Sequence, residues 1–390
     1  MTVQESHGWD LRAPMGDSLR ILMVAARYFP FMGGTEAHIH ETGRRLAERG
    51  HSVSVLTTDP TGRLAACEAV AGMRVARVRA WPKNRDWCFA PQLYSHIAKR
   101  HWDVVHVQGY HTFVAPIAML AAARNDIPFV LTFHSGGHSS KLRNSIRGMQ
   151  CTALRPLVNR AARCLAVSDF EADLFSASLR LPRDRFTVVP NGAHVPAPAR
   201  DTVPANGGCL IVSVGRLERY KGHHRAIAAM PHLLQRLPSA RLCVLGEGPY
   251  EGPLRDQIQQ LGLTEHVTIS AIPAGDRQAM GTLLSGSSLV VLFSDYEAHP
   301  IAILEALSLQ KPVVVTSTSG LKELADRGLA RSVTLGASPV EIASVMAEEI
   351  GARRPAPTIA LPSWEDCCTR LVEVYASVVS GTRPASQEHG

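Results

Sequence analysis

The stretch SDYEAHPIAILEAL, residues 294–307, decides the fold of this chain. Before it, residues 288–293 are uncharged and rich in β-branched and large apolar side chains, as in a parallel strand that is buried on both faces. After it, residues 312–316 have the same character. Because parallel strands need a crossover connection, residues 300–309 are predicted to form a helix between them.

Two glutamates in this stretch are candidate site residues. Glu297 lies on the strand-to-helix turn, where open α/β sheets bind ligands at the carboxyl ends of their strands. Glu305 falls among apolar residues of the predicted helix, where a carboxylate needs hydrogen-bonding partners or a cleft. The alternatives are a solvated turn carboxylate for Glu297 and a helix residue that points to water for Glu305.

Length and composition predict a soluble protein of two domains. A chain of 390 residues exceeds what one core usually supports, and 45% hydrophobic with 19% charged residues is an ordinary globular composition. No run approaches the ~18 uncharged apolar residues of a membrane span, and residues 1–17 lack the apolar core of a signal peptide. We therefore expect a cytoplasmic protein with flexible tails at 1–17 and 381–390.

The eight cysteines are scattered along the chain. Several lie within apolar strand-like runs, and no C-x-x-C spacing occurs. We therefore expect buried, reduced thiols and no zinc or redox site at the cysteines.

The net charge of +7 is concentrated in one segment. Residues 96–163 contain nine lysines and arginines and two aspartates, which equals the whole excess. Within this segment, residues 141–163 carry six basic residues, no acidic one, and apolar residues at roughly helical spacing. Such a helix can lie on anionic lipid or bind an acidic substrate, and a solvated helix face is the alternative. Its lack of aromatic residues disfavours membrane insertion and nucleic-acid binding.

The first predicted strand, residues 19–26, leads into a turn that contains Gly33 and Gly34. A helix follows over residues 35–49, with Thr35 as its expected N-cap. Two glycines before a helix let backbone N–H groups approach an anion, so they are a phosphate-site candidate, although a plain turn also explains them. The motif G-x-G-x-x-G is missing, which argues against a dinucleotide fold.

Two histidines are associated with predicted strands of the first half. His134 comes directly after residues 128–133, at the edge where this architecture binds ligands. His106 lies in the preceding strand, residues 104–107, and is expected to line the same crevice. A structural histidine is the alternative for each.

A change of composition divides the chain. Residues 196–208 are rich in Pro, Ala and Gly without periodicity, which is typical of a linker, and a new strand follows at 209–214. The next turn carries Gly215, Arg216 and Lys221. An arginine and a lysine on such a loop suit a diphosphate, and solvated loop charges are the alternative.

From about residue 19 to residue 379 the chain resembles the retaining glycosyltransferases of sequence family 4. The markers that carry this resemblance are Gly33-Gly34-Thr35-Glu36, His134, Val189-Pro190-Asn191-Gly192, Gly215-Arg216 with Lys221-Gly222, Gly246-Glu247-Gly248-Pro249, and Glu297 with Glu305 at E-x7-E spacing. The resemblance implies an α/β protein of GT-B architecture, in which two Rossmann-like parallel-sheet domains face each other across a cleft. It places an acceptor domain at 18–198, a nucleotide-sugar domain at 199–362, and a C-terminal helix at 363–380 that packs back on the first domain.

The resemblance also implies a role for each marker. Arg216 and Lys221 would bind the donor's diphosphate and stabilise its charge as it leaves, without a metal. Glu297 would contact the transferred sugar, Glu305 the ribose, and His134 would lie beneath the sugar near the reacting carbon. Further expected donor contacts are Gly33, Gly34, Gly215, His299, Pro300 and Ile301, and weaker candidates are His106, Asn191 and Gly246.

The implied reaction moves a hexose from a nucleotide diphosphate sugar, in most such families a UDP-sugar, to a hydroxyl of a glycan, glycolipid or small-molecule acceptor. Retention would follow from same-face attack, in which the leaving phosphate oxygen takes the acceptor's proton. A nucleotide-sugar 2-epimerase, a phosphorylase of the same fold and a non-catalytic sugar-nucleotide-binding partner subunit remain alternatives. The segment 141–163 favours a lipid-linked acceptor and peripheral contact with the anionic inner membrane face.

Two positions depart from the family pattern. Members commonly carry a Gly-Phe-Gly-like run after the first glutamate, where this chain has residues 298–301, Ala-His-Pro-Ile. We therefore expect His299 beside the donor sugar and seek sugar specificity there. Many members have an acidic residue after the histidine, where this chain has Ser135.

Overall fold

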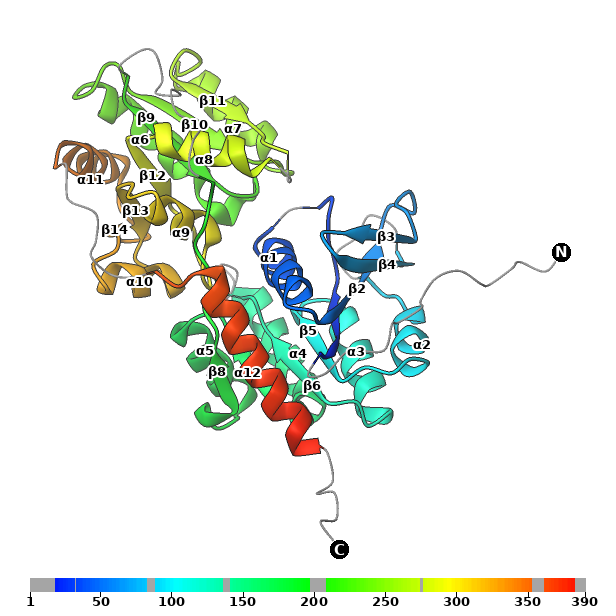
Figure 1. Ribbon diagram of the computed structural model, residues 1–390. Coiled ribbons are helices and arrows are strands. Elements are labelled where there is room, and N and C mark those ends of the chain that lie inside the picture. The colour runs from blue at the N-terminus through cyan, green and yellow to red at the C-terminus, as the bar shows by residue number, and fades with distance from the viewer. Residues whose placement is uncertain are drawn as a thin grey trace, which may run out of the picture.

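The computed structural model describes residues 18–31, 33–82, 88–135, 141–196, 208–273, 276–352 and 361–382, with only the backbone of 141–147 and 382. These residues form two sheets that lie in separate lobes and are flanked by helices (Figure 1). The predicted class, two α/β domains built on parallel sheets, is confirmed.

The first sheet has eight strands in the order β3-β4-β2-β1-β5-β6-β7-β8. Their bounds are Arg20–Ala25 (β1), Ser52–Asp59 (β2), Cys67–Val70 (β3), Met73–Arg79 (β4), Val104–Gln108 (β5), Phe129–Thr132 (β6), Arg163–Ala166 (β7) and Phe186–Val188 (β8). All neighbours are parallel except β3 and β4. The central strands are buried along most of their length, because helices cover both faces of the sheet.

Helices connect the strands of the first lobe, except that β2, β3 and β4 follow one another directly. The helices are α1 (Gly34–Glu48), α2 (Gln92–Ala98), α3 (Val114–Arg124), α4 (Lys141–Val158), α5 (Asp169–Leu179) and the short η1 (Arg183–Arg185). Gly33 is the N-cap of α1 and provides no side-chain hydrogen bond. The prediction of Thr35 as the N-cap is wrong, because Thr35 lies inside the first turn of α1.

The second sheet has six parallel strands in the order β11-β10-β9-β12-β13-β14. The strands are β9 (Leu210–Val214), β10 (Arg241–Leu245), β11 (Val267–Ser270), β12 (Leu289–Leu292), β13 (Val313–Thr316) and β14 (Arg331–Val333). The helices are η2 (Arg219–Lys221), α6 (His223–Leu234), α7 (Glu251–Gln260), α8 (Arg277–Gly286), α9 (Ile301–Ser308), α10 (Ser319–Asp326) and α11 (Pro339–Gly351). The strand order reverses between β9 and β12, and such a switch point is where open α/β sheets bind ligands.

The last helix, α12 (Trp364–Thr382), leaves the second lobe and lies along the first (Figure 1). Its side chains Trp364, Leu371 and Tyr375 are buried in one core with strands β1 and β2. The helix extends through Thr382, so the first two residues of the expected tail are helical. The domain limits near 198 and 362 stay predictions, because residues 197–207 and 353–360 lie outside the described ranges.

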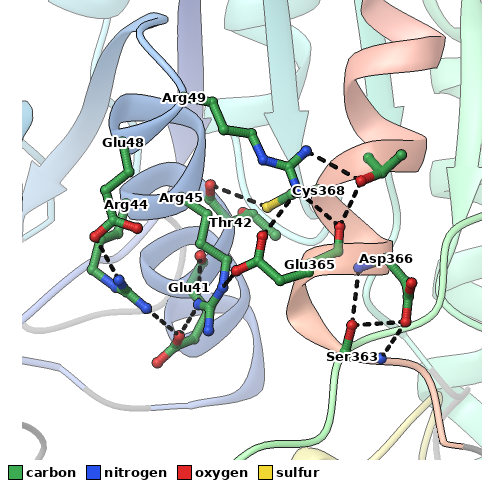
Figure 2. Close-up of polar contacts among 11 residues, drawn as sticks. Glu41, Thr42, Arg44, Arg45, Glu48, Arg49, Ser363, Glu365, Asp366 and Cys368 are labelled. Carbon is green, nitrogen blue, oxygen red and sulfur yellow. Dashed lines mark hydrogen bonds and ion pairs between the residues drawn. The ribbon is translucent and has the colours of Figure 1, made fainter.

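Ion pairs between α1 and α12 hold the last helix at its start (Figure 2). The carboxylate of Glu365 lies 2.7 Å from Nε of Arg45 and 2.9 Å from Nη2 of Arg49. Arg45 also pairs with Glu41 on its own helix. This cluster therefore joins the end of the chain to the helix that follows the Gly-Gly turn.

The arginines of the basic segment that the structure describes bond to backbone. Side chains of Arg155, Arg160 and Arg163 donate to carbonyl oxygens of neighbouring elements at 2.9 to 3.3 Å. They tie α4 and β7 to the fold, and the side chains of Lys141, Arg143 and Arg147 lie outside the described part. No helix among the described residues is long and apolar enough to cross a membrane.

Candidate active site

The carboxyl ends of β9 and β12 bring together residues that lie far apart in the sequence. Because these strands are parallel neighbours, the loops that follow them lie at the same edge of the sheet. Lys221 Nζ lies 2.6 Å from Oε1 of Glu297, and Ser294 donates to the same oxygen at 2.8 Å. Both partners are largely buried, with 16% and 11% of their side chains exposed. The structure therefore pairs two of the predicted donor-site residues directly.

Close backbone packing positions the lysine. Gly222 has φ 75°, and a Cβ there would come within 1.8 Å of the carbonyl oxygen of Phe293, so only glycine fits. The rings of Tyr220 and Tyr296 stack with centroids 4.6 Å apart. These contacts join the two loops into one unit and aim Lys221 at the strand end.

The electrostatics of this loop keep its cations charged. Burial lowers the pKa of Lys221, but the adjacent Glu297 carboxylate outweighs it, and the net pKa is raised. Arg216 donates to the hydroxyl of Tyr220 at 3.0 Å. Burial raises the pKa of Glu36 on α1, and the positive charge of Arg216 acts in the opposite direction. The charge of Arg216, in the second lobe, therefore favours the ionised form of Glu36 in the first lobe.

Glu305 has a partner that the sequence did not reveal. Its side chain is 4% exposed and pairs with Arg277 at the start of α8. Burial raises the pKa of Glu305 to about 7, while Arg277 acts in the opposite direction. The carboxylate on an apolar helix thus has the partner that such a position requires. Arg277 belongs to no motif, so spacing offered no signal for it.

His134 follows β6 in a left-handed conformation, with φ 53°. Its Nε2 lies 2.5 Å from Oε1 of Gln108, which ends β5. The next residue, Ser135, donates its backbone N–H to the buried carboxylate of Glu171 on α5. Burial raises the pKa of Glu171 to about 7. Glu171 therefore accepts from the backbone N–H groups of Ser135 and Val167, and no sequence motif marked this carboxylate.

His106 has a structural environment. It is fully buried, its Nδ1 lies 2.6 Å from the hydroxyl of Tyr375, and its Nε2 lies 2.7 Å from Oγ1 of Thr132. The expectation that it lines the crevice is wrong, because the ring packs between the sheet and α12 with both nitrogens bonded.

The His299 imidazole is engaged with the first lobe. Its Nδ1 lies 3.2 Å from the backbone nitrogen of Asn191, and its carbonyl oxygen accepts from Asn191 Nδ2 at 3.0 Å. Only 9% of His299 is exposed. Because Nδ1 is bound in this contact between the lobes, the expected position of the His299 ring beside the donor sugar stays a prediction.

Pro300 is the N-cap of α9, and Ile301 is the first residue of that helix. The side chain of Ile301 packs against the first lobe's core, on the side of β1 and α12. The start of α9 therefore lies at the interface of the lobes, with its backbone N–H groups at a helix N-terminus.

The glycine candidates differ in their surroundings. A Cβ on Gly246, which has φ 151°, would lie 2.0 Å from the carbonyl oxygen of Gly215, so the two donor-side loops touch through their backbones. The carboxylate of Glu36 folds over Gly33, whereas a Cβ on Gly34 would meet nothing within 4 Å. Gly34 thus presents backbone at an open surface.

The cysteines are free thiols, and all are buried except Cys67 and the half-buried Cys209. Burial raises the pKa of Cys164 to about 11 and that of Cys368 to about 12, so both stay protonated at neutral pH. No group of three or more His, Cys, Asp or Glu side chains within the described ranges is arranged to hold a metal ion.

Two family models match this chain in series. The model described as Glycosyltransferase Family 4 matches residues 32–195, and that described as Glycosyl transferases group 1 matches residues 200–345. The chain belongs to the family 4 type of GT-B glycosyltransferases. This confirms the resemblance carried by the sequence markers.

Relatives of this glycosyltransferase span most of its length. Glycogen synthase of Mycobacterium tuberculosis is 29% identical, with 94% of this chain and 96% of the relative covered. The GDP-mannose:cellobiosyl-diphosphopolyprenol alpha-mannosyltransferase of Xanthomonas oryzae is 27% identical, with 74% and 76% covered. A crystal structure of Anabaena HepE in complex with UDP and glucose has a TM-score of 0.74 at 18% identity and covers 92% and 100% of the two chains. The last likeness shows the shared fold.

Proposed function

We propose that this glycosyltransferase moves a hexose from a UDP-sugar to a hydroxyl of a glycan, glycolipid or small-molecule acceptor, with retention and without a bound metal. The observation that carries this proposal is the pairing of Lys221 with Glu297 at 2.6 Å, where β9 and β12 end. It joins a cation suited to a leaving diphosphate to a carboxylate suited to sugar hydroxyls.

The second lobe would hold the donor. Arg216 and Lys221 would neutralise the diphosphate as it leaves, which is the work that a metal ion does elsewhere. Oε1 of Glu297 is held by Lys221 and Ser294, and its other oxygen would accept a hydrogen bond from the sugar. Glu305 would accept from the ribose hydroxyls and share its charge with Arg277. The uridine base is proposed on the fold shared with HepE, whose structure contains UDP and glucose.

The reaction would proceed on one face of the sugar. The acceptor hydroxyl would attack beside the leaving phosphate, whose oxygen would take its proton, so no protein nucleophile is required. Glu297 and Glu305 each pair with a cation, Lys221 and Arg277 respectively. They therefore differ from the acid and nucleophile pair of retaining glycosidases, whose carboxyl groups lie about 5 Å apart. His134 would lie beneath the sugar.

The acceptor would bind on the first lobe. We favour a lipid-linked or phosphorylated acceptor, because a relative from Mycolicibacterium smegmatis, 28% identical, is a phosphatidyl-myo-inositol mannosyltransferase and the segment 141–163 is basic. The protein would then act in the cytoplasm, at the inner membrane face. Co-sedimentation with anionic vesicles at low salt tests this placement, and an absence of binding there contradicts it.

One assay separates the proposed function from its alternatives. The protein is incubated with UDP-, GDP-, ADP- and dTDP-sugars, with and without glycan, lipid-linked and small-molecule acceptors, and nucleotide release is followed. We expect release that needs both a UDP-sugar and an acceptor. Conversion or release that is fully independent of acceptor indicates an epimerase, and a shift in melting temperature without turnover indicates a binding subunit.

A further inference from the structure

The two chain segments that connect the lobes meet at one point. The backbone N–H of Ala193 donates to the carbonyl oxygen of Pro362 at 2.9 Å. A Cβ on Gly192 would lie 2.2 Å from the backbone nitrogen of Trp364, so the two backbones are in contact there. Trp364 is 2% exposed and begins α12. The crossing is therefore closely packed, and any change in the angle between the lobes must act through it.

Asn191 lies next to this crossing and bonds to both lobes. Its backbone N–H and its Nδ2 donate to Nδ1 and to the carbonyl oxygen of His299 in the second lobe, at 3.2 and 3.0 Å. Its Oδ1 lies 2.9 Å from Nδ1 of His38 on α1. His38, Asn191 and His299 are 1%, 4% and 9% exposed. Both polar atoms of the Asn191 side chain are therefore hydrogen-bonded inside the interface.

These bonds determine the protonation of both imidazoles. Because Nδ2 of Asn191 donates to a carbonyl, its Oδ1 is the acceptor, and Nδ1 of His38 must carry the proton. Nδ1 of His299 faces an N–H and must be unprotonated. Burial lowers the pKa of each histidine to about 4, so both are neutral at pH 7.

The chain of contacts continues to His134. The rings of His38 and His134 pack edge to face with centroids 4.8 Å apart. At the other end, His299 lies two residues after Glu297 and directly before the N-cap of α9. Side chains of the second lobe's donor loop and of the first lobe's sheet edge are therefore linked through a single asparagine.

We propose that Asn191 is a positioning residue that, through His299 and His38, sets the donor loop at the distance from His134 that sugar transfer requires. The proposal rests on the proposed function. Misplacement of reacting groups by about 1 Å can cost on the order of 100-fold in rate. Nucleotide binding should be less affected, because Arg216 and Lys221 belong to the second lobe alone.

The test compares variants that remove or keep each bond. His299→Leu removes the acceptor for the Asn191 N–H, whereas His299→Asn offers an amide oxygen near the place of Nδ1. His38→Leu and His38→Asn form the same comparison on the other side, and Asn191→Ala removes both side-chain bonds. His194→Asn is the control, because this histidine lies on the same connection with an exposed side chain. For each protein, kcat and KM of transfer and the Kd of UDP are measured.

We expect His299→Leu, His38→Leu and Asn191→Ala to lower kcat about tenfold or more while the Kd of UDP changes less than about threefold. The two asparagine variants should recover most of the loss, and His194→Asn should match the wild type. A loss of UDP affinity as large as the loss of kcat/KM makes His299 a direct donor contact and overturns the proposal. Unchanged kcat in Asn191→Ala overturns it as well.

Two controls distinguish a failure of the positioning role from misfolding and from a failure of the proposed function. Circular dichroism and the melting temperature identify a variant that does not fold, and the remaining leucine variant then decides. A wild-type protein that transfers no sugar contradicts the proposed function, whereas an active wild type with fully active variants contradicts only the positioning role.

Discussion

Oε1 of Glu297 accepts hydrogen bonds from both the Lys221 ammonium and the Ser294 hydroxyl. The negative charge of this side chain is therefore the property to test. Glu297→Gln keeps the shape but removes the negative charge. We expect kcat of transfer to fall by about 100-fold or more, because donors and acceptors aimed at a reacting group typically contribute that much. Steady-state kinetics with a UDP-sugar measure the effect. Glu218→Gln, on the same loop as Lys221, is the matched control, and near-normal turnover of a folded Glu297→Gln protein contradicts the assignment.

Arg277 keeps the Glu305 carboxylate partly ionised at neutral pH, where burial raises its pKa to about 7. An ionised carboxylate accepts ribose hydrogen bonds better than a protonated one, so UDP affinity should rise as pH rises through 7. Arg277→Met removes the opposing cation, and we expect this rise to move to higher pH. Titration calorimetry from pH 6 to pH 9 measures the shift. Lys322→Met, in an exposed pair on α10, should leave the profile unchanged, and an unshifted profile in Arg277→Met argues against the ribose role.

At the residue scale, sequence motifs predicted the residues that follow strands, and missed their partners. Arg216, Lys221 and Glu297 could be found because strand ends and glycine-bounded loops mark them. Arg277 and Glu171 could not, because each reaches its partner across the fold from a helix with no distinctive spacing. The bonds of His299 to the first lobe were not predicted either, since Asn191 lies 108 residues away in sequence.

At the scale of elements, α12 depends on one buried hydrogen bond more than on its surface ion pairs. Tyr375→Phe leaves Nδ1 of buried His106 without its partner, which should cost about 1 to 3 kcal/mol. Glu365→Gln weakens pairs to Arg45 and Arg49 on a residue whose side chain is 62% exposed, and should cost less than about 1 kcal/mol. Urea unfolding of the two variants measures both values. An equal or reversed order contradicts this account of how the helix is held.

The elements that could be predicted are those with continuous apolar runs. The strands predicted at residues 104–107 and 209–214 lie within one residue of the observed bounds of β5 and β9, because buried parallel strands leave such runs. Strand β3 was missed because its residues are mostly exposed and it pairs at an antiparallel edge. Helix α2 was missed because seven residues provide too few turns for a clear period.

At the scale of the whole molecule, buried neutral histidines set the response to acid. Burial lowers the pKa of His38, His223 and His299 to about 4, while an unfolded chain protonates near pH 6.5. Between these values the unfolded state binds more protons, so stability falls as pH falls, by up to about 1.4 kcal/mol per pH unit for each histidine. The pKa values of His106 and His134 are also lowered well below 6.5, in the same sense.

Carboxylates whose pKa is raised act in the opposite direction, namely Glu36, Glu171, Glu305 and Glu323. Burial raises the pKa of Glu171 and Glu305 to about 7, so the stability they contribute is present at low pH and is lost as pH rises from 4.5 to 7. Because the histidines outnumber them, we expect the free energy of unfolding to decrease from pH 6.5 to pH 5. Urea unfolding at fixed ionic strength measures it. A flat or rising stability over this range contradicts the neutral assignment of the buried histidines.

Two neighbouring cations distinguish a donor site between β9 and β12 from a general effect of positive charge on this loop. Lys221 and Arg219 lie in the same short helix η2, but only Lys221 pairs with Glu297. Acceptor-dependent nucleotide release from a UDP-sugar is measured for the wild type, Lys221→Ala and Arg219→Ala. We predict a loss of about 100-fold or more in Lys221→Ala and a change of less than about twofold in Arg219→Ala. Equal rates in the two variants would contradict the donor site described for this chain.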